Sequence, residues 1–164
     1  PPRRPVSWSG IRDATKDSNI CVQDDAISKI LKLTVSEDCL YLNVYTPKMF
    51  NGKDPQTKYP VMVWIHGGSF MTGSGHSLNY SPKFLLDKDI VLVAINYRLG
   101  PLGFLSTGDN VIRGNQGLKD QVLALKWVQR NIAAFGGDPD SVTIFGESAG
   151  GASTHFLMLS PLAK

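Results

Sequence analysis

The sequence predicts an α/β fold with a mainly parallel central sheet, and three features carry that prediction. Two continuous apolar runs, Val61 to Ile65 and Ile90 to Ile95, suit strands that are buried on both faces. Between Asn115 and Phe135, apolar residues recur every three or four positions, which is typical of one face of a helix. A further β-rich run, Ser141 to Phe145, returns the chain to a strand. Strands joined by a crossover helix in this order make a parallel sheet.

Two earlier segments are predicted to form small strands ahead of this sheet. Residues Ala26 to Val35 and Asp38 to Thr46 alternate apolar and polar side chains and are rich in β-formers. We expect them to pair as antiparallel edge strands. Residues 47–59 are polar and contain glycine and proline, which predicts a loop before the first buried strand.

The composition is that of a globular protein with one hydrophobic core. Of the 164 residues, 42% are hydrophobic and 19% are charged. No run reaches the length of about 18 apolar residues that a membrane span requires. The net charge is +3 with both signs interspersed, so we expect neither a nucleic-acid partner nor an anionic membrane surface. Because Pro1 is neither an initiating methionine nor part of an apolar signal segment, we expect the chain to begin inside a longer one.

The two cysteines, Cys21 and Cys39, lie 18 positions apart. Neither has the paired spacing or the neighbouring histidines of a metal site, so no metal is expected, and no motif implies an organic cofactor. Two alternatives are open from the residues alone. One is a disulfide, which would indicate an oxidising compartment; the other is a pair of free buried thiols.

A G-x-S-x-G pentapeptide occupies residues 146–150, after the run that ends at Phe145 and before a predicted helix from Ala149 to Leu159. Strand, tight turn and helix are the setting of a nucleophile elbow. Glycines on both sides of Ser148 allow the strand and the helix to pass closely, so that the serine hydroxyl projects above the sheet edge. The motif also occurs by chance, but this setting favours Ser148 as a catalytic nucleophile.

A second motif, His66-Gly67-Gly68-Ser69-Phe70, directly follows the first buried run. Loops at the carboxyl ends of central strands are where ligands meet an open α/β sheet. Small consecutive residues expose backbone N–H groups, which can stabilise the oxyanion of a tetrahedral intermediate. The alternative is a turn whose glycines only permit positive φ. The presence of Ser148 favours an oxyanion hole.

These motifs, together with Glu37 to Val44 and Phe135 to Pro139, occur in an order that resembles the type-B carboxylesterases. That family of α/β-hydrolases includes cholinesterases and many detoxifying esterases, and the resemblance covers essentially the whole chain. It implies that residues 1–164 are an incomplete N-terminal portion of a single α/β-hydrolase domain.

The resemblance also assigns roles to individual residues. Ser148 corresponds to the nucleophile, and the backbone N–H groups of Gly68, Ser69 and Ala149 correspond to the oxyanion hole, with Gly67 shaping the loop. Many relatives have glycine where this chain has Ser69. A backbone donor survives that change, but serine is costly if the position needs a positive φ.

Cys21 and Cys39 match the family's first disulfide, which implies a secreted protein or one in the secretory-pathway lumen. The segment between them contains no Trp, Tyr or Phe. Cholinesterases carry an aromatic residue there that holds the quaternary ammonium by cation–π attraction. We therefore expect a small-molecule, uncharged carboxylic ester as substrate rather than a choline ester.

The catalytic triad of this fold runs Ser, then Asp or Glu, then His along the chain. No acidic residue follows Ser148. The one later histidine, His155, would lie about 10 Å along the helix from the serine, while His66 is interpreted as shaping the oxyanion loop and His76 as a loop residue. The triad acid and histidine are therefore expected outside this chain.

We accordingly expect these 164 residues to be inactive alone, although the parent chain would hydrolyse esters through an acyl-enzyme intermediate. They are also expected to aggregate, because residues 141–145 would form an uncovered sheet edge.

Alternatives remain open within the same fold. A binding protein is one, since the family resembles cell-adhesion proteins that lack the nucleophile, although Ser148 favours catalysis. A lipase or a hormone-specific esterase would keep every residue named above. Asn79 begins an Asn-Tyr-Ser glycosylation pattern that Pro82 follows immediately. The sequence does not specify the oligomeric state.

Overall fold

The computed structural model describes residues 1–3, 5–47 and 58–163. Its main sheet has four strands in the order β3-β5-β4-β6. They are β3 (Leu42–Tyr45), β4 (Tyr59–Ile65), β5 (Val91–Ile95) and β6 (Gly137–Gly146). Strand β4 is parallel to β5 and β6, whereas β3 is antiparallel to β5. The predicted α/β class with a mainly parallel sheet is confirmed.

The two apolar runs form β4 and β5, which are the inner strands of the sheet. All five residues of β5 are buried, as are Val61, Val63 and Ile65 of β4. Pairing of Ile65 with Gly146 brings the carboxyl ends of β4 and β6 to the same edge. Most of the polar loop predicted at residues 47–59 lies outside the described residues, because 48–57 are not described.

The crossover helix α3 (Gln116–Asn131) continues into the short helix η2 (Ile132–Phe135) and ends at Gly136, whose φ of 79° suits glycine. After β6 comes α4 (Ala149–Leu159), with the bounds that the sequence predicts. Helix α4 packs against β4 and β6, and α3 against β6 and α4. The shorter helices η1 (Leu86–Lys88) and α2 (Gly100–Phe104) were not anticipated.

The N-terminal segment differs from its prediction. Residues 26–35 contain a helix, α1 (Ala26–Ile30), between the two-residue strands β1 (Ile20–Cys21) and β2 (Val35–Ser36), and these strands pair in parallel. Asp25 caps α1 by accepting a hydrogen bond from the Ser28 N–H, which favours the helix over a strand. The predicted pairing of residues 26–35 with 38–46 is therefore wrong, and β3 pairs with β5 instead.

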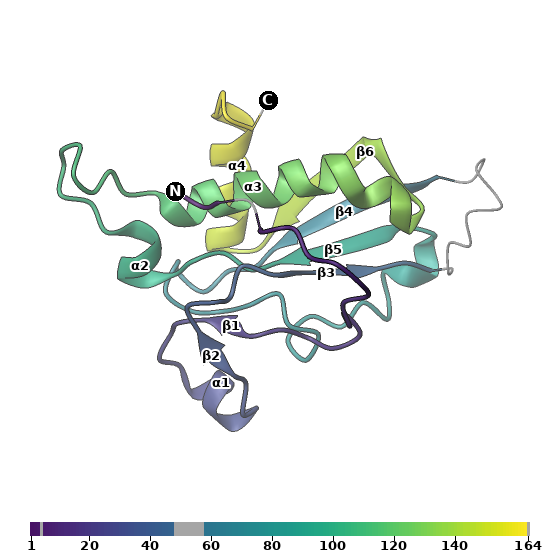
Figure 1. Cartoon of the computed structure of the whole chain (residues 1–164), viewed down its shortest axis with the longest axis horizontal. Helices are drawn as coiled ribbons and strands as arrows, with labels where there is room; N and C mark the ends of the chain where they lie inside the picture. The colour runs from purple at the N-terminus through teal and green to yellow at the C-terminus, as the bar shows by residue number, and fades with distance from the viewer. Residues whose placement is uncertain (4, 48–57, 164) are drawn as a thin grey trace.

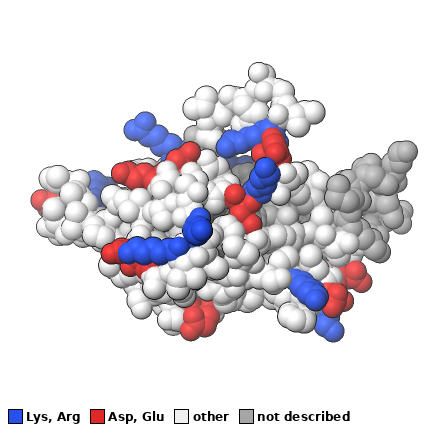
Figure 2. All heavy atoms as spheres, turned by 90° about the horizontal axis from the view of Figure 1, so that it is seen from below, with Lys and Arg blue, Asp and Glu red and all other residues white. Residues whose placement is uncertain are grey.

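The small unit of β1, α1 and β2 lies below the main sheet in Figure 1, whereas α3 and α4 lie at its upper side. Acidic and basic side chains lie next to one another over the face seen in Figure 2, with no large area of one sign. Within the described ranges, no helix is long and apolar enough to cross a membrane.

Candidate active site

Ser148 lies at the turn between β6 and α4, and its backbone is strained. Its φ is 54° and its ψ is −119°, a combination that residues with a Cβ rarely adopt. The turn leaves Ser148 exposed at the sheet edge while the next residue, Ala149, is buried. This is the local geometry that a nucleophile elbow requires.

Glycines make this turn possible because β4 passes directly behind it. A Cβ at Gly146 would lie 2.5 Å from the carbonyl oxygen of Ile65, and one at Gly150 would lie 1.9 Å from the same oxygen. Any larger residue at either position would push α4 away from the sheet. The pentapeptide glycines thus seat the first turn of α4 against the end of β4.

The loop that follows β4 has an unusual run of left-handed residues. Gly68, Ser69 and Phe70 have φ values of 104°, 56° and 60°. A Cβ at Gly68 would lie 2.2 Å from the carbonyl oxygen of Thr72, so glycine is required there. Ser69 also has a positive φ, so its Cβ makes this conformation costly, as the sequence comparison with glycine-bearing relatives suggests.

The loop and the elbow are in contact. A Cβ at Gly67 would lie 3.2 Å from the Ser148 Cβ and 2.7 Å from the carbonyl oxygen of Glu147. The register of β4 and β6 explains this proximity, since both motifs leave the sheet at the same edge. Ala149 is the first residue of α4, so its N–H has no partner inside that helix and adds to the positive end of the helix dipole.

His66 is fully buried under the loop. Its Nδ1 lies 2.8 Å from the carbonyl oxygen of Gly67, and its ring stacks on Tyr97 with centroids 4.4 Å apart. Burial lowers the pKa of His66 to about 4, only partly opposed by the Gly67 hydrogen bond. The ring is therefore neutral near pH 7, with Nδ1–H donating to Gly67, an arrangement that fits a residue shaping the loop.

The other two histidines lie elsewhere. His76 Nδ1 is 3.8 Å from an Asp17 carboxylate oxygen, and His155 is exposed in the second half of α4. Burial and the charge of Glu147 raise the pKa of Tyr80, whose ring packs on that of Trp64 with centroids 4.9 Å apart.

Three residues that support the loop escaped the sequence analysis. The Tyr97 hydroxyl donates to the carbonyl oxygen of His66 over 2.8 Å, and the side chains of Asn96 and Gln23 bind the loop's distal end. A signal did exist for two of them. Asn96 and Tyr97 directly follow β5, at the same sheet edge as His66, which is where an open α/β sheet places its functional loops.

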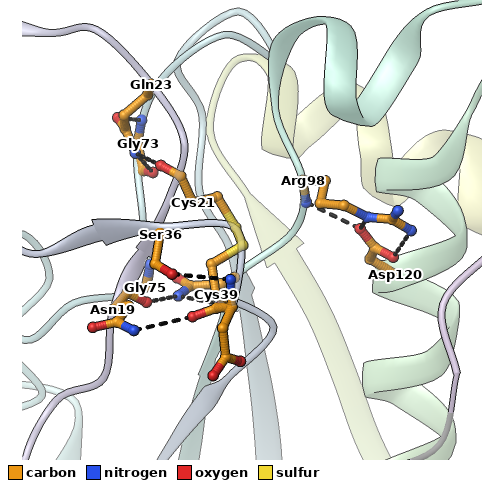
Figure 3. The surroundings of a disulfide bond; sticks show 11 residues. Asn19, Cys21, Gln23, Ser36, Cys39, Gly73, Gly75, Arg98 and Asp120 are labelled. Atoms are coloured by element: carbon orange, nitrogen blue, oxygen red, sulfur yellow. Dashed lines mark hydrogen bonds and ion pairs between the residues drawn. A yellow bond between two sulfur atoms is a disulfide. The ribbon is translucent and has the colours of Figure 1, made fainter.

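Cys21 and Cys39 are both buried and form a disulfide, as predicted (Figure 3). The Asn79 amide donates to the hydroxyl of buried Ser74 over 3.0 Å, and its glycosylation stays a prediction. Over the part of the chain that the structure describes, no three His, Cys, Asp or Glu side chains are grouped to hold a metal ion.

Comparison with known proteins gives consistent matches along the chain. The model of the carboxylesterase family matches residues 1–164. Venom carboxylesterase-6 of Apis mellifera is 51% identical over 99% of this chain and 29% of its own length. Esterase E4 of Myzus persicae is 52% identical over 96% of this chain and 28% of its own length.

Solved structures agree with these matches. Juvenile hormone esterase from Manduca sexta superposes with a TM-score of 0.86 at 43% identity, covering 96% of this chain and 29% of that one. A PNB esterase superposes with a TM-score of 0.82 at 48% identity, covering 96% of this chain and 32% of that one. The present chain thus spans less than a third of the length of these relatives.

Proposed function

The chain belongs to the carboxylesterase family, and from that premise we propose that the whole protein is a serine hydrolase of small, uncharged carboxylic esters. Residues 1–164 would be the N-terminal portion of its single α/β-hydrolase domain. The observation that carries the proposal is the contact between Ser148, held in a strained turn, and the glycine loop at Gly67. A strained nucleophile beside backbone donors is the arrangement that acyl transfer needs.

In the proposed reaction, the Ser148 hydroxyl attacks the ester carbonyl carbon and gives its proton to a histidine base. The resulting oxyanion accepts hydrogen bonds from the N–H groups of Gly68, Ser69 and Ala149. The alcohol leaves with the proton from the histidine, and the serine is acylated. Water then attacks the acyl carbonyl carbon and gives a proton to the histidine, while the same N–H groups bind the second oxyanion. The histidine returns this proton to the Ser148 oxygen as the carboxylic acid leaves.

The acid and the histidine of the triad are proposed to lie outside these 164 residues. No acidic residue follows Ser148 in the sequence. Among the three histidines, His66 is buried with its Nδ1 at Gly67, His76 is beside Asp17, and His155 is exposed on α4. Without a base the serine is an ordinary hydroxyl.

The substrate class rests on the segment closed by the disulfide. Residues 22–38 contain no aromatic side chain that could hold a quaternary ammonium. The disulfide itself supports a secreted protein or one in the secretory-pathway lumen, because such bonds persist in oxidising compartments.

The test is ester hydrolysis by the full-length protein and its Ser148→Ala variant, measured with p-nitrophenyl acetate and with a choline ester. We expect the wild type to hydrolyse the uncharged ester faster than the choline ester and to be labelled once per chain by an organophosphate. The variant should lose both activity and labelling. A folded, unlabelled and inactive wild type would instead favour a binding protein of the same fold.

A further inference from the structure

We propose that Gln23, which lies next to the disulfide, is a positioning residue that fixes the oxyanion loop from outside the active site. This inference rests on the proposed function, since it concerns how the same loop is held in place. Gln23 is 50 positions away from its partner in the loop, Gly73, so only the folded structure brings the two together.

The Gln23 side chain binds both backbone polar groups of Gly73, its N–H and its carbonyl oxygen, and we call this pair of hydrogen bonds the clamp. Gln23 Nε2 donates to the carbonyl oxygen of Gly73 over 2.8 Å, and Gln23 Oε1 accepts from the Gly73 N–H over 2.7 Å. The second Nε2 hydrogen donates to the carbonyl oxygen of Cys21 over 3.1 Å. A single amide therefore uses both of its N–H donors and its oxygen, and it joins the cystine to the loop. Figure 3 shows Gln23 and Gly73 facing one another above Cys21.

Gly73 in turn sits against the beginning of the loop. A Cβ on Gly73 would lie 2.4 Å from His66 Nδ1 and 2.7 Å from the carbonyl oxygen of Gly67. These are the two atoms whose hydrogen bond shapes the loop. Any displacement of Gly73 is therefore transmitted to Gly67, which itself contacts Ser148, and to the adjacent donor at Gly68.

The clamp has a rigid base. Cys21 is bonded to Cys39, and the Asn96 side chain donates to the carbonyl oxygens of both Asn19 and Cys39. The Asn96 oxygen also accepts from the Gly75 N–H over 2.8 Å. Asn96 follows β5 directly, so the cystine, the loop and the central sheet are tied into one unit.

Loss of the Gln23 amide would leave the Gly73 N–H and carbonyl without these partners and free the distal end of the loop to move. Oxyanion stabilisation depends on donors that are already in place when charge develops. A displacement of a fraction of an ångström lowers the rate of the chemical step more than it lowers substrate binding.

The experiment uses the full-length protein with Gln23→Ala, and Asn19→Ala as the matched control. Asn19 is also a partly buried amide beside the same disulfide, but its side chain donates to the carbonyl of Asp38 and not to the loop. The substitution keeps the Asn19 backbone carbonyl that accepts from Asn96. We expect Gln23→Ala to lower kcat about tenfold with KM changed less than about twofold. Inhibition by a trifluoromethyl ketone, which forms a tetrahedral adduct with serine, should weaken by a similar factor. The control should change neither quantity.

Gln23→Glu provides a second readout that a merely structural role would not move. Its ionised carboxylate can accept from the Gly73 N–H but cannot donate to the Gly73 carbonyl, whereas the protonated acid can do both. We expect Gln23→Glu at pH 8 to lower kcat at least as much as Gln23→Ala does, because its carboxylate faces the carbonyl oxygens of Gly73 and Cys21 with no hydrogen to donate.

Hydrogen exchange of the backbone amides at residues 66–73 tests whether Gln23 holds the loop without measuring activity. Faster exchange in Gln23→Ala, but not in Asn19→Ala, supports the clamp. Unchanged exchange, or an unchanged kcat and trifluoromethyl ketone affinity in an active enzyme, overturns the positioning role. If the wild type hydrolyses no ester, the proposed function fails, and the exchange data alone decide whether Gln23 holds the loop.

Discussion

At the scale of single residues, the candidate site depends on backbone conformations that most side chains avoid. Ser69, Phe70 and Ser148 all have φ near 55–60°, and each such residue costs about 1 kcal/mol or more. For Ser148 the strained turn is what exposes the hydroxyl. For Ser69 only the backbone N–H is proposed to act. Its side chain has no proposed role, although a residue with a Cβ is strained at this φ.

We therefore expect Ser69→Gly to raise the free energy of unfolding of the full-length protein by about 1 kcal/mol, because glycine accepts this φ without strain. Thermal or urea unfolding measures the change. Ser141→Gly is the control, since Ser141 is exposed in β6 and glycine weakens a strand by roughly 0.5–1 kcal/mol. Equal destabilisation by both substitutions would show that Ser69 carries no strain.

The burial of His66 should make the stability of the fold depend on pH. Its pKa in the folded chain is about 4, below its ordinary value of 6.5, so the unfolded chain binds more protons between these values. Stability from this residue is complete above about pH 6.5 and is lost as the pH falls towards 4, by about 3 kcal/mol in total. The free energy of unfolding, measured with urea, should differ less between pH 7 and pH 5 in His66→Asn than in the wild type. Identical pH dependence in both proteins would contradict the buried, neutral histidine.

At the scale of elements, the small unit of β1, α1 and β2 is held by few contacts of its own. Its strands have two residues each, too short to be stable without other support. The disulfide and the Asn96 hydrogen bonds attach it to the sheet. This explains why alternation of residue types misled the prediction for residues 26–35: local capping by Asp25 and covalent closure outweigh β propensity there.

Removal of the disulfide by Cys21→Ser with Cys39→Ser should lower the free energy of unfolding of the full-length protein by roughly 3 kcal/mol, because an unfolded chain without the cross-link has more conformational freedom. Chemical unfolding of the double variant against the wild type measures it, with the single exposed substitution Asp24→Ala as a control. A difference of less than about 1 kcal/mol would mean that the hydrogen bonds alone attach the unit.

At the scale of the whole molecule, two neighbouring surfaces favour association: the edge of the sheet at β6 and the exposed apolar side chains of α4. Among the described residues, strand β6 pairs with β4 alone, and α4 exposes Phe156, Met158 and Leu159. An unpaired strand edge beside apolar side chains is a template for association.

We therefore predict that residues 1–164 produced alone associate and do not hydrolyse p-nitrophenyl esters, whereas the full-length protein does. Size-exclusion chromatography with light scattering, together with an ester assay on each fraction, tests both parts. A monomeric sample of the 164 residues with turnover abolished by Ser148→Ala would refute the prediction.

The sequence by itself determined the features that depend on local pattern. The two continuous apolar runs became β4 and β5, the β-rich run at residues 141–145 became the second half of β6, and the three- to four-residue period became α3. The bounds of α4 were also predicted, because the signals that start and end a helix act over a few residues. The pentapeptide and the glycine loop could be recognised as candidate motifs for the same reason.

Only the tertiary structure decided what these motifs touch. The contact between Gly67 and Ser148, the burial of His66 under Tyr97 and the clamp of Gln23 on Gly73 all join segments that are far apart in the chain. Strand order and register create these contacts, and neither is encoded in any short stretch of residues. Propensity marks where a strand or a helix forms, whereas packing and buried hydrogen bonds select its neighbours.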